Sequence, residues 1–362
     1  MPRTNRNISD NALLEFTRQL VRIVPSIETL EEELKRLSSA IKPSEFTRGD
    51  FNQVLFSLER IYYITLLMKE LQEHFSSRIQ FGGGVVLNYV FMPQLDVPRF
   101  TFDLDSSWRE RVSSKRSILG EIVGFNKYLS EKYPLCLPTS ADKCLKLMTV
   151  EYDVEKDHFP HVLSLRLPVI TRWSGVEFYN YVKVSTGLEL DYTALSKLRK
   201  CFQSSIGVKD ARVDYVRFEI TLEPGYPSRE LEVDLPFKLG RVKLNITELE
   251  YQLASKLVFK IGWNFGADLQ ANLHDVLKAI LDMRLLVLVD EFRFKNYVEL
   301  LASSRGLRLR DIGDNIERNT SELLKTGGEL WSGFHYLLIR AKYRDLLKLI
   351  QGTVRRLYNL LF

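Results

Sequence analysis

The chain has 362 residues, a formal net charge of +5, 45% hydrophobic residues and 27% charged residues. This composition is typical of a globular protein with a sizeable core, and it excludes a disordered or fibrous chain. No apolar run approaches the roughly 20 residues of a membrane span and the N-terminus is polar, so we expect a cytoplasmic protein without membrane attachment.

Helical periodicity dominates the first 77 residues, and the longest predicted helix covers Asn52 to Phe75. A short strand is predicted over Arg78 to Phe81. Apolar residues then continue as a buried helix over Val85 to Phe91, and a loop covers Pro93 to Pro98.

The tract Arg99 to Asp105 alternates with the period of a strand. One face carries Phe100, Phe102 and Leu104, and the other carries Arg99, Thr101, Asp103 and Asp105. Two carboxylates two residues apart on a strand have Cα atoms roughly 6.5 Å apart, so both side chains can reach one or two hard cations such as Mg²⁺. An ordinary edge strand with a charged, solvated face explains the same alternation.

Three consecutive glycines, Gly82, Gly83 and Gly84, precede the buried helix. Without side chains, their backbone N–H groups can approach phosphates at a helix N-terminus. A glycine turn before an Asp-x-Asp strand favours phosphoryl or nucleotidyl transfer, in which positioning and charge neutralisation dominate catalysis. The alternative is a loop that needs glycine for its backbone conformation.

After a helix over Val112 to Lys132 the pattern changes to strands. The predicted strands are Met148 to Val154, Val162 to Ile170, Glu177 to Val184, Tyr215 to Leu222 and Glu230 to Leu235, with a helix near Tyr192 to Phe202. From Thr247 onward the pattern is helical again. The order of helices, mixed sheet and helices predicts an α+β fold in three parts, 1–77, 78–240 and 241–362.

The three cysteines, Cys136, Cys144 and Cys201, form no CxxC pair and no even set typical of secreted proteins. We therefore expect three free thiols.

The tracts Gly82-Gly83-Gly84-Val-Val-Leu and Arg99-Phe-Thr-Phe-Asp103-Leu-Asp105 resemble two signatures of the AbiEii/AbiGii nucleotidyltransferase toxins. These signatures are Gly-Gly-[Ser/Thr]-Ala-Leu and Arg-x-[Ser/Thr]-x-Asp-[Leu/Ile]-Asp, and the family belongs to the DNA polymerase beta-like nucleotidyltransferase superfamily. The resemblance implies a mixed β-sheet core flanked by helices. Gly84 stands where the family commonly has a serine or threonine.

The resemblance also implies a third carboxylate on a later strand. The tract Glu230 to Pro236 places Glu230, Glu232 and Asp234 on one face. Asp234 is the preferred third metal ligand, with Glu232 as the alternative. A solvated edge strand that ends at Pro236 explains the tract equally well.

A phosphate-binding lysine is expected on the next helix, for which Thr247 is a candidate N-cap with Glu250 three residues later. Lys256 lies at the edge of the apolar stripe, where it can extend to water or reach a triphosphate. The family typically has Ala-Glu-Lys-Leu at this point, and the chain has Ala254-Ser255-Lys256-Leu257.

A following helix carries His274-Asp275, which is similar to the family's Arg/Lys-Asp-x-x-Asp-Leu element. By that resemblance Asp275 is the acid/base or orienting residue, although Lys278 replaces the second aspartate. A surface aspartate on an amphipathic helix is the alternative.

Basic residues cluster near helices that also carry aromatic residues. The runs are Lys197 to Lys200, Arg305 to Arg310 and Arg340 to Arg356, and the aromatic residues are Trp331, Tyr343 and Tyr358. Such runs bind an RNA backbone in some proteins and form solvated helix faces in others.

Together these features predict an enzyme that transfers a nucleoside monophosphate from a nucleotide triphosphate to an acceptor hydroxyl. Asp103, Asp105 and Asp234 would hold Mg²⁺ or Mn²⁺, and Arg99 and Lys256 would join the three glycines in binding the triphosphate. The resemblance implies the toxin of a toxin-antitoxin or phage-defence pair, with a tRNA 3′ end as acceptor and an antitoxin protein as partner. The alternatives are an enzyme that modifies proteins with nucleotides and a degenerate nucleotide- or RNA-binding module without catalysis.

Overall fold

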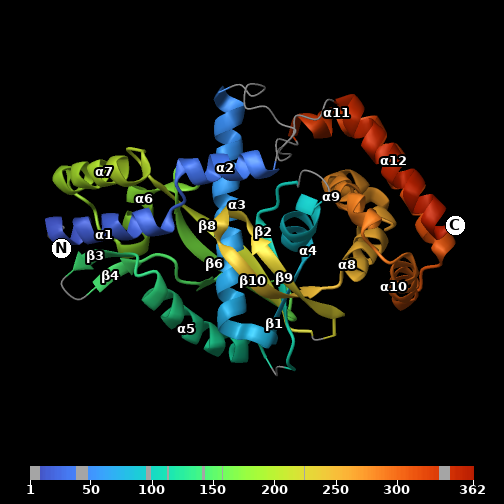
Figure 1. Ribbon diagram of the computed structural model, residues 1–362, viewed down its shortest axis with the longest axis horizontal. Helices are drawn as coiled ribbons and strands as arrows, with labels where there is room; N and C mark the ends of the chain where they lie inside the picture. The colour runs from blue at the N-terminus through green and yellow to red at the C-terminus, as the bar shows by residue number, and fades with distance from the viewer. Residues whose placement is uncertain are drawn as a thin grey trace. The chain divides into compact units, whose positions relative to one another are not determined.

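The computed structural model describes residues 9–37, 48–94, 99–111, 114–140, 143–156, 158–223, 225–333 and 343–362, and Figure 1 shows its ribbon. Contacts between residues divide the chain into two compact units. Unit 1 contains Met1–Gln80, Phe102–Pro224 and Asp234–Val242, and unit 2 contains Phe81–Thr101, Gly225–Val233 and Lys243–Phe362. Each unit combines three separated segments, so this division cuts across the three parts expected from the order of elements.

Four strands of unit 1 lie side by side in the order β5 (Glu151–Tyr152), β6 (Val162–Thr171), β8 (Arg212–Thr221) and β2 (Asp103–Trp108). The pairing of β8 is antiparallel with β6 and parallel with β2. A short strand, β7 (Val176–Glu177), also pairs with β8. Mixed strands accompanied by helices confirm the predicted α+β class.

In the described part of unit 1 the helices are α1 (Asp10–Ile23), α2 (Ile27–Leu37), α3 (Arg48–Phe75), η2 (Ser76–Arg78), α5 (Lys115–Lys132), α6 (Phe178–Thr186), α7 (Tyr192–Ile206) and η5 (Pro236–Lys238). The long helix α3 contacts β2, β6 and β8, and Figure 1 shows it running beside these strands. Alternate strand residues such as Leu104, Leu165 and Phe218 are fully buried. The intervening residues therefore lie on the opposite face of the strands.

A buried ion pair joins several elements of unit 1. The Arg172 guanidinium lies 2.5 Å from the Glu59 carboxylate, and both side chains are almost wholly buried. Arg172 also donates to the carbonyl oxygens of Pro25 and Ile206, at 2.6 and 3.0 Å. The pair thereby links α3 to the residues that follow β6, precede α2 and end α7.

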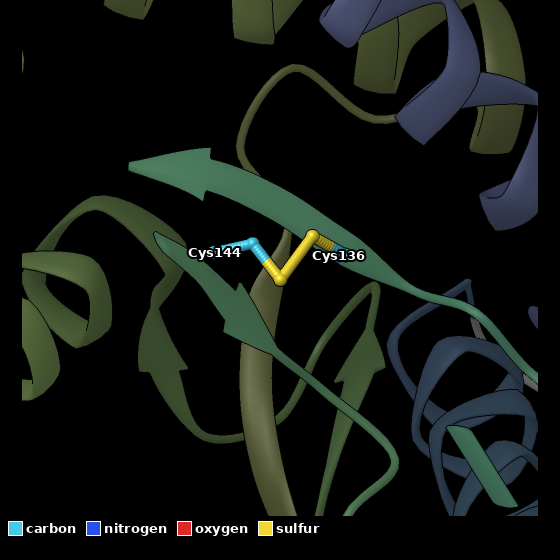
Figure 2. Close-up of a disulfide and its surroundings, with 2 residues drawn as sticks. All are labelled: Cys136 and Cys144. Carbon is cyan, nitrogen blue, oxygen red and sulfur yellow. A yellow bond between two sulfur atoms is a disulfide. The ribbon is translucent and has the colours of Figure 1, made fainter. Parts of the chain in front are cut away.

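Two cysteines that we expected to be free form a disulfide. Cys136 and Cys144 lie on β3 (Cys136–Ser140) and β4 (Lys143–Lys146), an antiparallel pair, and Figure 2 shows the bond between them. Their Cα atoms are 5.6 Å apart, a separation that a disulfide spans. The expectation of three free thiols was wrong for this pair, because spacing along the chain does not show that a hairpin brings them together. Cys201 is free.

We expect replacement of both cysteines by serine to lower the free energy of unfolding by about 2–3 kcal/mol, since the disulfide closes a short loop in the unfolded chain. Urea unfolding with and without a thiol reductant measures this effect. The reductant should destabilise the wild type by a similar amount and leave the double variant unchanged. Equal stability of the reduced and oxidised wild type would contradict the prediction.

The strands of unit 2 come from β1 (Ile79–Gly82), β10 (Gly240–Thr247) and β9 (Ser228–Leu235), which are neighbours in that order. Phe81 of β1 pairs in parallel with Ile246 of β10. After β1 the chain forms one helical stretch, which consists of α4 (Gly83–Val85), η3 (Val86–Phe91) and η4 (Met92–Gln94). The predicted helix over Val85 to Phe91 is confirmed, and it is buried.

The rest of unit 2 is helical, with α8 (Leu249–Lys256), η6 (Leu257–Ile261), η7 (Gly266–Asp268), α9 (Leu269–Asp282), η8 (Met283–Val287), α10 (Glu291–Ser304), α11 (Leu309–Gly333) and α12 (Tyr343–Leu361). α8 contacts α10, and α9 contacts α11 and α12. Within the described part of the chain, no helix has both the length and the apolar character needed to cross a membrane.

Two predicted elements differ from the structure. The strand expected at Glu177 to Val184 is helix α6, whose buried residues Phe178, Tyr181 and Val182 have helical spacing. Gly187, with a φ of 69°, ends it in the left-handed conformation that glycine adopts readily.

The second difference is at Thr247, the expected N-cap. Thr247 is the last residue of β10, a strand that the sequence analysis did not predict. The N-cap of α8 is Glu248, which makes no capping hydrogen bond through its side chain.

Candidate active site

The Asp-x-Asp pair lies on the solvent side of β2, in unit 1. Asp103 is exposed and Asp105 is half-buried, whereas Leu104 between them is fully buried. The predicted alternation of this strand is therefore confirmed from Asp103 onward. Arg99 and Thr101 precede the strand and are buried in unit 2.

A third carboxylate that sequence reasoning missed lies next to this pair. In the parallel register of β2 and β8, Asp105 is opposite Glu219, and residues opposite one another share a face. Glu219 is exposed, and the Ser164 hydroxyl on β6 donates to its carboxylate at 3.5 Å. The backbone oxygen of Glu219 accepts a hydrogen bond from Ser106 at 2.7 Å. Neighbouring strands thus bring Asp103, Asp105 and Glu219 to one face.

The preferred third ligand from the sequence, Asp234, lies on a different strand. Glu230, Glu232 and Asp234 are exposed along one face of β9, as predicted. The neighbour of β9 is β10, whereas β8 pairs with β2. The Asp234 carboxylate is 75% exposed and lies 3.2 Å from the Arg241 guanidinium. The strand pairing therefore favours Glu219 over Asp234 and Glu232 as the companion of the Asp-x-Asp pair.

The glycine turn of unit 2 has the close packing that glycine permits. Gly83 has a φ of 67°, a conformation that L side chains rarely adopt, and it begins the helical stretch. A Cβ atom on Gly84 would lie 2.6 Å from the Thr101 hydroxyl and 3.2 Å from the Arg99 guanidinium. A side chain at Gly84 would thus displace groups beside a helix N-terminus, where backbone N–H groups can bind anions.

Behind this turn lies a buried charge cluster centred on Asp282, a residue not identified from the sequence. Arg99 binds the Asp282 carboxylate through two hydrogen bonds of 2.8 Å, from Nε and Nη2. Asn88 donates to the same carboxylate at 3.0 Å and to the carbonyl oxygen of Gly84 at 3.0 Å. The Lys256 ammonium is 3.2 Å from Asp282. The structure thereby joins Arg99, Lys256 and the glycine turn, as the proposed triphosphate site requires.

The electrostatics of the Asp282 cluster favour a further anion. Burial by itself raises the pKa of Asp282, but the charges of Arg99 and Lys256 outweigh that effect and hold the pKa at about 2. Two cations, Arg99 and Lys256, thus contact this one carboxylate. The side chains of Arg99 and Asp282 are buried, whereas that of Lys256 is 22% exposed. Lys256 is therefore the cation of the cluster that a ligand can reach.

Asp275, the aspartate chosen from the sequence, lies outside this cluster. Its carboxylate is 41% exposed and lies 2.8 Å from Lys260 and 3.4 Å from Lys278. Partial burial raises its pKa, and the hydrogen bond and charge of Lys260 lower it to below the ordinary value. These contacts are those of a surface ion-pair network on α9, which was the alternative interpretation of this residue.

The carboxylate oxygens of Asp103 and Asp105 on β2 are ligands of the kind that Mg²⁺ prefers. Mg²⁺ binds one or two carboxylates and keeps water or phosphate oxygens as its other ligands, and Asp103 and Asp105 meet that requirement. Across the residues that the structure describes, no three His, Cys, Asp or Glu side chains are grouped to hold a metal ion by themselves. A bound ion would therefore depend on water and a substrate phosphate for its remaining ligands.

The basic runs noted in the sequence fall on helix surfaces where they are described. Arg199 pairs with Asp210 at 2.7 Å, and Arg308 pairs with Asp311 at 2.8 Å. The start of the third run, Arg340 to Lys342, lies outside the described residues, and so do the side chains of Trp331 and Tyr343.

The chain matches no protein-family model, and a comparison with curated proteins finds no significant match.

Proposed function

We propose that the protein is a Mg²⁺-dependent nucleotidyltransferase that moves a nucleoside monophosphate from a nucleotide triphosphate to a hydroxyl of RNA. The observation that carries this proposal is the placement of Asp103, Asp105 and Glu219 on one face of two paired strands. Asp103 and Asp105 suit a hard cation that completes its coordination with water and phosphate oxygens, and Glu219 adds a third carboxylate to the same face. The family resemblance of the Asp-x-Asp tract supports the same activity and suggests a role as the toxin of a toxin-antitoxin pair.

Unit 2 by itself carries groups that suit the binding of phosphates. The backbone N–H groups of Gly83 and Gly84 would donate to phosphate oxygens, and Lys256 would neutralise their charge. Asp282, which Arg99 and Asn88 hold through hydrogen bonds, would orient Lys256 through their ion pair.

In the proposed reaction an RNA hydroxyl oxygen bonds to the α-phosphorus, the bond from that phosphorus to the bridging oxygen breaks, and pyrophosphate leaves. Glu219 would accept the proton of the attacking hydroxyl. Asp103 and Asp105 would hold magnesium, which supplies charge neutralisation at the phosphates.

The test is incubation of the full-length protein with Mg²⁺, total tRNA and each of the four α-³²P-labelled nucleotide triphosphates. We expect label on RNA with the wild type. Glu219→Gln should lower the initial rate about 10²-fold, since a general base contributes about 10² to 10⁴. Asp234→Asn should remain within about twofold of the wild type, because it changes one exposed ion pair.

Three other outcomes would count against parts of this proposal. If Asp234→Asn loses transfer and Glu219→Gln transfers normally, the third carboxylate of the site is Asp234 on β9 and not Glu219. Label on the polypeptide instead of RNA would identify an enzyme that modifies proteins. Absence of label on RNA and protein with all four nucleotides would reject the transferase and favour the non-catalytic binding module.

A further inference from the structure

The exposed face of unit 1 continues from the carboxylates onto a row of charged residues. The registers of β2, β8, β6 and β5 place Asp103 opposite Arg217, Arg217 opposite Arg166, and Arg166 opposite Glu151. Residues in register across neighbouring strands share a face, and adjacent strands are about 4.8 Å apart. Arg217 therefore lies on the strand next to Asp103, and Arg166 lies on the strand beyond it, in the direction away from β2.

Arg217 is anchored by a carboxylate that has little other support. Asp153, which follows β5, is 1% exposed, and neither of its carboxylate oxygens has a hydrogen-bond partner. The Arg217 Nε lies 3.4 Å from the Asp153 carboxylate, and the Arg217 side chain is 54% exposed. Burying a carboxylate without hydrogen bonds is costly, and a nearby cation such as Arg217 offsets part of that cost. Asp153 thus keeps the guanidinium close to the strands while much of it faces solvent.

Arg166 is held in place on the same face by an aromatic ring and a carboxylate. Its guanidinium carbon lies 4.4 Å from the centre of the Tyr215 ring, and its Nε lies 3.0 Å from the Glu151 carboxylate. The ring and the ion pair fix the plane of the guanidinium, which lowers the entropy lost when it binds a ligand. An arginine plane fixed in this way is a platform on which an unpaired RNA base can stack.

We propose that Arg217 and Arg166 bind the single-stranded end of the acceptor RNA, with Arg217 on a backbone phosphate and Arg166 under a base. This inference rests on the proposed function, since it names the surface that presents the attacking hydroxyl. Asp103 and Glu219 repel any polyanion that approaches them, and Arg217 beside Asp103 compensates for that repulsion at the nearest phosphate. A protein acceptor would have no such requirement.

The test measures RNA binding without nucleotide or Mg²⁺, so it does not depend on catalysis. Fluorescence anisotropy would follow a labelled single-stranded RNA of about 12 nucleotides between about 50 and 200 mM salt. Each phosphate contact on a single strand contributes about 0.7 to the slope of log affinity against log salt concentration. Arg217→Gln should reduce the slope by about that amount and weaken binding roughly fivefold at the lowest salt.

Arg241→Gln is the matched control. Arg241 is also a strand arginine of unit 1, is 62% exposed and pairs with a carboxylate at 3.2 Å, but it lies on β10. Its slope and affinity should equal those of the wild type. Arg217→Lys retains a positive charge near Asp153. It should keep the wild-type slope and bind RNA more weakly. A changed slope in Arg217→Gln alone therefore reports the lost phosphate contact and not a loss of folding.

Equal slopes for Arg217→Gln and Arg241→Gln, or no measurable binding of the RNA by the wild type, would overturn this inference. If the wild type binds RNA through Arg217 but transfers no label, the proposed binding surface stands and the proposed activity is rejected. If the wild type transfers label to RNA but Arg217→Gln has the wild-type slope of log affinity against log salt concentration, the proposed activity stands and this binding surface is rejected.

Discussion

Replacement of Asp105 by asparagine is expected to reduce nucleotide transfer at least about 10²- to 10³-fold, the size of effect that follows loss of one group stabilising charge in a transition state. Asparagine preserves the shape of the side chain and removes the charge that attracts a hard cation. Asp105 is half-buried and lies opposite Glu219, so its charge belongs to the carboxylate face to which the proposal assigns Mg²⁺. Initial rates of label transfer to RNA, measured over a range of Mg²⁺ concentrations, give the effect.

Asp210→Asn provides the comparison for Asp105→Asn. Asp210 is also an aspartate of unit 1, is 54% exposed and pairs with Arg199 at 2.7 Å. Its replacement should leave both the rate of transfer and the free energy of unfolding nearly unchanged. If Asp105→Asn folds normally and transfers label at the wild-type rate, the strand face is not the catalytic one.

The largest expected effect on stability comes from Asp282. Its replacement by alanine leaves the guanidinium of Arg99 buried without a counter-charge, and breaking a buried pair in this way costs about 3–5 kcal/mol. Asp275→Ala removes an exposed carboxylate from the neighbouring turns of the same helix and should cost less than about 1 kcal/mol. Urea unfolding of both variants measures the difference, and equal stabilities would contradict the buried role of Asp282.

The pH dependence of stability provides an independent check on Asp282. Its pKa in the folded protein is about 2, below the ordinary value of 3.8. A carboxyl group with a lowered pKa stabilises the folded state above its unfolded pKa, and that stabilisation disappears as the pH falls through the folded pKa. The difference in unfolding free energy between the wild type and Asp282→Asn should therefore be constant above about pH 4 and shrink towards pH 2.

The local patterns of the sequence predicted the faces of the strands but not their partners. Alternation along β2 and β9 correctly placed Asp103 and Asp234 on exposed faces. The same alternation in β8 places Arg217 and Glu219 on one face, but no local signal shows that a strand more than 100 residues later pairs with β2. Glu219 was missed because strand pairing is a long-range property of the fold.

The sequence around Asp282 contains a local signal of a buried charge that the sequence analysis did not use. Asp275 matched the order of residue types in the family element, yet its carboxylate is 41% exposed on α9. Asp282 follows Leu281 and precedes Met283, and all three are buried. An aspartate within an apolar run at a helix end indicates a buried charge that needs a partner. Which cations meet it there depends on tertiary packing and could not be predicted from the run itself.

The interleaving of the two units has a consequence for synthesis of the protein. Unit 1 needs residues 234–242 for completion, and by the time these residues leave the ribosome, residues 81–101 and 225–233 of unit 2 have already emerged. Domains made of one continuous segment can fold in turn from the N-terminus, but this chain cannot finish unit 1 before unit 2 has begun. A nascent chain arrested near residue 230 would therefore expose unfinished apolar surfaces of both units at once and would be a natural client for chaperones.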